Sequence, residues 1–187
     1  YTPFEGPRTP AAVGLVDFRI VDLKTHDGLA LPVWVKDAAP GRPTILHFHG
    51  NGGGNHISLD RLKALADLGF GIRAMEYRGY LDAPGKPTET DIKADAIALV
   101  DQALADGLSP RDLVIYGWSL GSGVAVPTAV ARPVRALILE TPFTAAVDVA
   151  AWRFPFLPVR RLMKDQWRSR DVAGQVTTPT LILHGTK

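Results

Sequence analysis

One serine stands where a strand would turn sharply into a helix. Ser119 lies between Gly117 and Gly121 in YGWSLGSG, residues 116–123, which follows one apolar run and leads into another. A serine hydroxyl is a weak nucleophile unless it is exposed, aimed and deprotonated, and a strand-to-helix turn provides the exposure. Glycines two residues to either side let the backbones approach in so tight a turn. The pattern predicts that Ser119 is a catalytic nucleophile, the alternative being glycines that serve only close helix packing.

Acyl transfer also needs backbone N–H donors, because negative charge develops on the substrate oxygen. The loop HGNGGGN, residues 49–55, follows an apolar run and precedes a helical pattern. We predict that the N–H groups of Leu120 and Asn51 form this oxyanion hole, with Gly52 as the less favoured alternative to Asn51. The residues expected to support the two loops are His49, Gly50, Gly117 and Gly121.

Metal and nucleotide chemistry are less well supported by the sequence. His47 and His49 would share one face of a strand, which suits a metal, but no acidic ligand follows in the loop. A buried or turn-stabilising role is therefore favoured for both. The chain has no cysteine and no G-x-x-x-x-G-K-[ST] motif, and Asn55 and Val126 replace the third glycine of a dinucleotide-binding motif. We predict no metal and no organic cofactor.

Alternating strands and helices must position these residues. Apolar runs predict the strands, and amphipathic or small-residue stretches predict the helices between them. The expected strands are residues 18–23, 29–36, 44–50, 70–79, 113–117, 134–140 and 180–185, and the expected helices are 58–69, 88–107 and 120–131. The first two strands alternate and are joined by the turn KTHDG, which predicts an antiparallel pair at the sheet edge. The whole pattern predicts a single α/β domain, residues 1–187, with a mostly parallel sheet.

The composition indicates a globular protein: 187 residues, 46% hydrophobic and 21% charged, with a net charge of +2. Residues 113–131 carry no charge and approach the length of a membrane span, but a buried strand and a Gly- and Ala-rich helix explain them better. For the basic cluster of Arg160, Arg161 and Lys164, a solvated patch is favoured over nucleic acid or an anionic membrane. A membrane-associating segment before Tyr1 is left open. No nucleic-acid partner is expected, and no compartment is assigned.

Four motifs in order amount to a family resemblance: HGNGGGN, EYRGYLDAPGKPTE, GWSLG and ETPFTAA. From Val16 to its end, the chain resembles the α/β-hydrolase superfamily, and within it the small, often membrane-associated esterases, thioesterases and lysophospholipases. The departures are Glu76 for the usual Asp, Leu81-Asp82 where Gly-x-Ser is expected, and one extra glycine in the HGN loop. The resemblance implies an α/β-hydrolase fold with helices on both faces of the sheet, and a small-molecule ester or thioester substrate cleaved through an acyl-enzyme.

The other two members of a catalytic triad are not evident in this chain. In this family the order is Ser, then Asp, then His, and the resemblance places the acid at or just beyond Lys187 and the histidine later still. The histidines present, all too early, are His26, His47, His49, His56 and His184. We expect a domain truncated at its C-terminus, without its last strand and flanking helices. Glu140 is an alternative acid and His184 an alternative base, although a structural role is favoured for each.

Residues 141–170 are expected to form a cap-like segment over the site. Its large apolar residues would either line an acyl-chain pocket or pack the cap onto the core: Phe143, Trp152, Phe154, Phe156, Leu157, Met163 and Trp167. The sequence does not separate these two roles, nor whether Arg78 and Tyr80 line the mouth of the site. Two other functions stay open: a non-catalytic binding module on this fold, and a cofactor-free triad enzyme acting on C–C or peroxide bonds.

Overall fold

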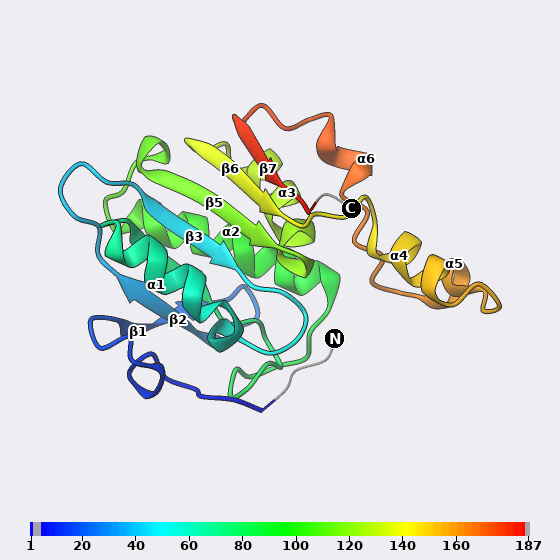
Figure 1. Cartoon of the computed structure of the whole chain (residues 1–187), viewed down its shortest axis with the longest axis horizontal. Helices are drawn as coiled ribbons and strands as arrows, with labels where there is room; N and C mark the ends of the chain where they lie inside the picture. Colours follow the sequence, from blue (N-terminus) through cyan, green and yellow to red (C-terminus); the bar gives the residue numbers. More distant parts are fainter. Residues whose placement is uncertain (2–4, 186–187) are drawn as a thin grey trace.

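The computed structural model describes Tyr1 and residues 5–185, which fold around one seven-stranded sheet (Figure 1). The strands are β1 (Arg19–Lys24), β2 (Ala30–Lys36), β3 (Thr44–Phe48), β4 (Gly71–Met75), β5 (Leu113–Trp118), β6 (Ala136–Glu140) and β7 (Thr180–Leu183). Their order is β1-β2-β4-β3-β5-β6-β7. The first hairpin is antiparallel and pairs antiparallel with β4, whereas all pairings from β4 to β7 are parallel. The expected edge hairpin and mostly parallel sheet are confirmed.

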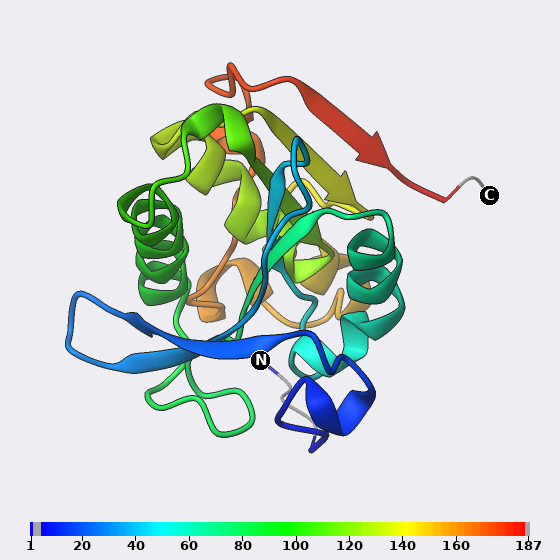
Figure 2. The ribbon, with the colours of Figure 1, turned by 90° about the vertical axis from the view of Figure 1, so that its left-hand side faces the viewer.

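Helices cover both faces of the sheet, as predicted. They are α1 (Leu59–Asp67), α2 (Glu89–Ala105), α3 (Leu120–Ala131), α4 (Ala146–Arg153), α5 (Val159–Leu162) and α6 (Arg170–Ala173), with short 3-10 turns at Ala11–Val13, Asn55–Ser58 and Pro110–Asp112. Figure 2 shows α1 on one side of the sheet and α2 with α3 on the other. Two separate apolar clusters result, one under α1 around Leu62 and Trp34, the other under α2 and α3 around Leu99 and Val124.

The uncharged stretch 113–131 folds as a buried strand, β5, followed by α3, as the sequence predicted. None of the helices in the described part of the chain combines the length and apolarity needed to cross a bilayer.

The sheet has a topological switch point where the candidate residues lie. β3 lies between β4 and β5, and Phe48 at the end of β3 pairs with Gly117 near the end of β5. The chain leaves β3 toward α1 on one face and leaves β5 toward α3 on the other (Figure 2). Ligands of parallel sheets bind in the crevice that such a divergence opens at the carboxyl ends of the strands.

Residues 141–170 carry α4 and α5, which project from the body at the end of the molecule toward which β5 and β6 point (Figure 1). The segment returns through α6, which packs near α3, to β7. β7 pairs with β6 at the edge of the sheet, and all four of its residues are exposed.

Candidate active site

Ser119 occupies a strained turn between β5 and α3. Its backbone angles are φ 52° and ψ −114°, a conformation that residues with a side chain rarely adopt. The Ser119 N–H donates to the carbonyl of Glu140 (2.9 Å), and the Ser122 N–H donates to the carbonyl of Ser119 (2.9 Å). Strand, turn and helix lie where the sequence predicted them, and Ser119 lines a pocket.

The flanking glycines are required by close backbone contacts. A Cβ on Gly117 would lie 2.4 Å from the carbonyl oxygen of Gly121, and one on Gly121 would lie 2.0 Å from the carbonyl oxygen of Phe48. Both distances are far inside van der Waals contact, and the atoms met are backbone. These two glycines let β3, β5 and α3 meet closely enough to place the serine at the strand ends.

The loop after β3 faces this turn, so the structure brings the expected oxyanion residues beside the serine. A Cβ on Gly50 would stand 3.6 Å from the Cβ of Ser119. Asn51 and Leu120 line the same pocket as Ser119, and Leu120 is the first residue of α3, where backbone N–H groups have no partner within the helix. Tyr80 is buried rather than at the mouth, and its hydroxyl donates to Oδ1 of Asn51 (2.9 Å).

A buried polar cluster supports the loop from below. Nδ1 of His49 donates to the Gly50 carbonyl (2.7 Å), and its Nε2 lies 3.1 Å from Oε1 of Glu76. Oε2 of Glu76 accepts from the N–H of Asn55 (3.0 Å), whose side chain donates to the Ala74 carbonyl (2.9 Å). The supporting role expected of His49 thus has a physical basis, although the sequence did not point to Glu76 as its partner. The strand predicted over residues 70–79 ends at Met75 in the structure. Glu76 therefore lies outside the strand and contacts the loop after β3.

Glu140, the alternative acid, is held by other side chains. Arg61 donates to both of its carboxylate oxygens, with Nε at 2.7 Å from Oε2, and the Tyr116 hydroxyl donates to Oε2. These hydrogen bonds, that of Arg61 first, lower the pKa of Glu140 against the opposing effect of burial. The Arg61 guanidinium also lies over the ring of Trp118, 4.1 Å from its centre. The network therefore holds Trp118, the residue before Ser119, in place. The sequence did not show this role for Arg61.

The described residues provide no histidine bonded to the serine hydroxyl. His47 is fully buried and burial lowers its pKa to about 3, while His49 is held as described above. His184, the alternative base, is exposed, with Nδ1 3.1 Å from the Gly185 carbonyl. The acid position expected at or after Lys187 lies outside the described residues.

The pocket beside Ser119 has a volume of about 520 Å³ and mainly apolar walls. It is lined by Tyr1, Asn51, Ser119, Leu120, Phe143, Ala146, Val149, Ala150, Arg153, Phe154, Met163, Lys164, Asp165 and Trp167. Four of the apolar residues expected in 141–170 therefore line it, namely Phe143, Phe154, Met163 and Trp167. The other three, Trp152, Phe156 and Leu157, are exposed and do not line this pocket. That outcome differs from the expected pocket-lining role.

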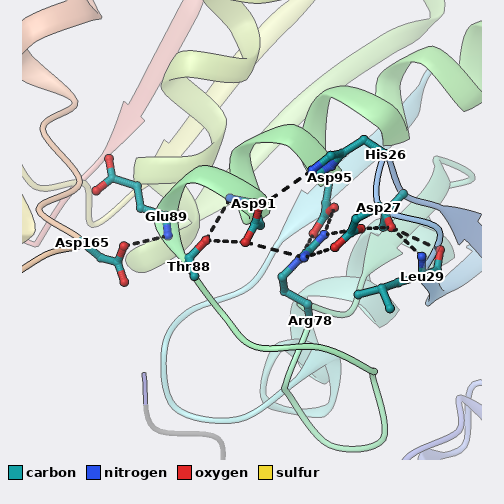
Figure 3. A network of polar contacts seen from close by, with 10 residues as sticks. His26, Asp27, Leu29, Arg78, Thr88, Glu89, Asp91, Asp95 and Asp165 are labelled. Carbon is teal, nitrogen blue, oxygen red and sulfur yellow. Dashed lines mark hydrogen bonds and ion pairs between the residues drawn. The ribbon is translucent and has the colours of Figure 1, made fainter.

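Arg78 lies in a structural network rather than at the pocket mouth (Figure 3). It is buried and forms two hydrogen bonds of 2.7 Å with Asp95 on α2, and it also contacts Asp27 in the β1–β2 turn (2.9 and 3.2 Å). Hydrogen bonding to Arg78 holds the pKa of Asp27 well below its usual range, while burial raises the pKa of Asp95. Arg78 thus ties the hairpin and α2 to the loop after β4.

The same network continues to the pocket wall at the start of α2. The Glu89 N–H donates to Asp165 (3.0 Å), as Figure 3 shows, and the Glu89 carboxylate accepts from the N–H of Trp167 (2.8 Å). These reciprocal bonds fix residues 165–167 and with them the buried Trp167 ring. Across the described part of the chain, no group of three His, Asp or Glu side chains is arranged to hold a metal ion.

Comparison with known proteins decides the family. The profile described as "Alpha/beta hydrolase family" matches residues 45–185, most of the chain and all of the elements that surround Ser119. The chain belongs to the α/β hydrolase family. A protein of Mycobacterium tuberculosis (strain H37Rv) is 36% identical over 188 residues, covering 99% of this chain and 67% of its own length.

Two further relatives carry informative names. Protein bem46 of Schizosaccharomyces pombe is 29% identical over 92% of this chain and 61% of its own length. The lysophosphatidylserine lipase ABHD12 of Danio rerio is 33% identical over 80% of this chain and 44% of its own. This α/β hydrolase chain therefore spans between about two fifths and two thirds of these relatives.

Solved structures agree on the fold of this α/β hydrolase chain. An α/β hydrolase of Vibrio vulnificus matches with a TM-score of 0.77 at 20% identity, covering 90% of this chain and 64% of that one. An esterase of Pyrococcus furiosus matches with a TM-score of 0.72 at 20% identity, covering 97% and 75%. At these identities the likeness concerns the fold alone.

Proposed function

We propose that the complete protein is a serine hydrolase that cleaves carboxylic esters or thioesters through an acyl-enzyme on Ser119. One observation carries the proposal: a strained strand-to-helix turn presents Ser119 to an apolar pocket that Asn51 and Leu120 also line. A binding module has no need of a strained serine at this place. The family membership and the lipase name of one relative support a hydrolase.

The reaction follows from this placement. The Oγ of Ser119 attacks the substrate carbonyl carbon while a histidine takes the hydroxyl proton, and the N–H groups of Leu120 and Asn51 hold the negative oxygen. The intermediate collapses, the C–O or C–S bond breaks, and the leaving alcohol or thiol takes the proton. Water then attacks the acyl-serine with the same histidine as base, and the carboxylic acid leaves as Ser119 regains its proton.

The histidine and the acid that orients it belong, in this proposal, to residues after Lys187 of a single α/β-hydrolase domain. Among the described residues, none of the five histidines hydrogen-bonds to the Ser119 hydroxyl, so none of them is assigned as the catalytic base. Residues 141–170 act as the cap, because α4 and the following loop form a wall of the pocket through Val149, Ala150 and Phe154. We propose a substrate with an acyl chain, since the walls are mainly apolar and adaptable residues such as Met163 line them.

The test is hydrolysis of p-nitrophenyl esters from acetate to dodecanoate by the complete protein, including its residues after Lys187. The proposal predicts turnover that rises with chain length until the pocket is filled, and its loss in Ser119→Ala. Ser58→Ala is the matched control, because Ser58 is buried but lies at the start of α1, where its side chain caps no backbone group. Equal turnover by Ser119→Ala would refute the assignment. Activity only in a peroxide-forming assay would replace the hydrolase by the triad enzyme of another reaction.

A further inference from the structure

Several large apolar side chains are exposed close together along the segment 149–164. Trp152 is 82% exposed, Phe156 84% and Leu162 67%, and Leu157 between them is 55% exposed. Exposed single apolar residues are ordinary, but a run of large ones marks a surface that meets a partner. Figure 1 shows that α4, α5 and the loop between them stand out from the body of the described residues.

The charge of the segment selects the kind of partner. Residues 149–164 contain four basic side chains, Arg153, Arg160, Arg161 and Lys164, and no acidic one, whereas the whole chain carries only +2. The remainder of the chain is therefore net negative, and the positive charge is concentrated where the aromatic side chains are exposed. Asp148 at the base of the segment pairs with Arg160 and Arg170. Among the described residues, Arg153 and Arg161 form no ion pair.

We propose that residues 149–164 dock on an anionic lipid bilayer, with Trp152 and Phe156 in the interface and Arg161 facing the lipid phosphates. Aromatic side chains favour the boundary between headgroups and acyl chains, and basic side chains are attracted to anionic headgroups. A second copy of this chain fits less well, because a symmetric contact would bring the same basic side chains together. An acidic protein surface would suit the charge but not the substrate pocket that shares these residues.

That shared pocket links the surface to the proposed function. Val149, Ala150, Arg153 and Phe154 of α4 line the cavity beside Ser119, and Trp152 next to them faces solvent. A lipid could therefore pass its acyl chain from the bilayer along α4 toward Ser119. This second step rests on the proposed hydrolase function, whereas membrane docking does not.

The experiment is sedimentation of the complete protein, including its residues after Lys187, with vesicles of phosphatidylcholine, alone or mixed with phosphatidylserine. Every protein carries Ser119→Ala, so that vesicle lipids stay intact and binding is read without turnover. We expect binding to the mixed vesicles that weakens at high salt. The pair Trp152→Ser and Phe156→Ser should lower the partition coefficient roughly tenfold or more, and Arg161→Gln about fivefold. The matched control is the pair Val16→Ser and Leu68→Ser, which removes exposed apolar side chains elsewhere and should leave binding unchanged.

Failure to sediment with the mixed vesicles would overturn the proposal, as would equal loss of binding in the control pair. Self-association that disappears in the Trp152 and Phe156 variant, without vesicle binding, would overturn it in favour of a contact between copies. In the complete protein with Ser119 intact, the same variant should hydrolyse soluble p-nitrophenyl acetate normally but lose activity on vesicle-borne esters. If neither substrate is cleaved while vesicles still bind, the hydrolase proposal fails and the docking proposal stands.

Discussion

Replacing Ser119 by glycine should stabilise the fold relative to alanine, although both variants remove the nucleophile. The native angles of φ 52° and ψ −114° crowd the Cβ of any residue other than glycine. Alanine retains the Cβ and therefore retains the strain. Two backbone hydrogen bonds at Ser119, to Glu140 and from Ser122, hold the turn in this conformation and are available to either variant.

Two opposing contributions set the difference in unfolding free energy between Ser119→Gly and Ser119→Ala. A residue with a side chain in such a conformation costs about 1–3 kcal/mol, and the greater freedom of glycine in the unfolded chain offsets roughly 0.5–1 kcal/mol of that. We expect Ser119→Gly to be more stable than Ser119→Ala by about 1 kcal/mol, which in a domain of this size raises the midpoint of thermal unfolding by about 2–4 °C.

The assay is urea unfolding of both variants, with thermal unfolding as a second measure. Ser122 is the matched control position, because it lies within α3, where its hydroxyl bonds to the Ser119 carbonyl. There, glycine should be less stable than alanine by about 1 kcal/mol, so the two positions should give opposite signs. A glycine at position 119 that is no more stable than alanine would refute the strain argument.

Three more variants test the packing at Gly121, the role of Glu140 and the burial of His47. Gly121→Ala places a Cβ 2.0 Å from the Phe48 carbonyl oxygen and should cost about 3 kcal/mol or more of unfolding free energy; a loss below about 1 kcal/mol would contradict the packing. Glu140→Gln in the complete protein should lower kcat less than about tenfold, because Glu140 fixes Arg61 and Trp118 and is not the triad acid; a fall of about ten-thousandfold would make it the acid. His47→Leu should reduce the fall in unfolding free energy that occurs as the pH is lowered. The folded protein keeps His47 neutral to about pH 3 while the unfolded chain takes up a proton below about 6.5, so stability is lost as pH falls between these values. If urea unfolding shows the same pH dependence of stability in His47→Leu as in the unmodified protein, His47 is not the source of the acid sensitivity.

Local patterns account for what could be predicted from the sequence. The strands and the three long helices follow from apolar periodicity, and the turn at Ser119 follows from glycine spacing, so each prediction used neighbouring residues. Long-range polar partners leave no such pattern. Arg61 and Glu140 are 79 positions apart, and the contact between His49 and Glu76 depends on how β4 ends.

The sequence also did not predict which side chains of α4, α5 and the loop between them are exposed. Trp152 and Phe156 are as apolar as Phe143 and Trp167, yet the first two are exposed and the last two line the pocket. Composition gives the same expectation for all four, and only the path of the chain in three dimensions separates them. In the same way, the sequence did not show that the basic cluster lies beside exposed aromatic side chains.

The reactivity of Ser119 is tested by the mass of the complete protein before and after treatment with a fluorophosphonate probe. Such probes form a covalent bond with an activated serine, and peptide fragmentation locates the modified residue. If Ser119 is the activated nucleophile, we expect a single adduct on Ser119 that is absent from Ser119→Ala and retained in Ser58→Ala. No adduct, or an adduct on another serine, would contradict the assignment of Ser119 as the nucleophile.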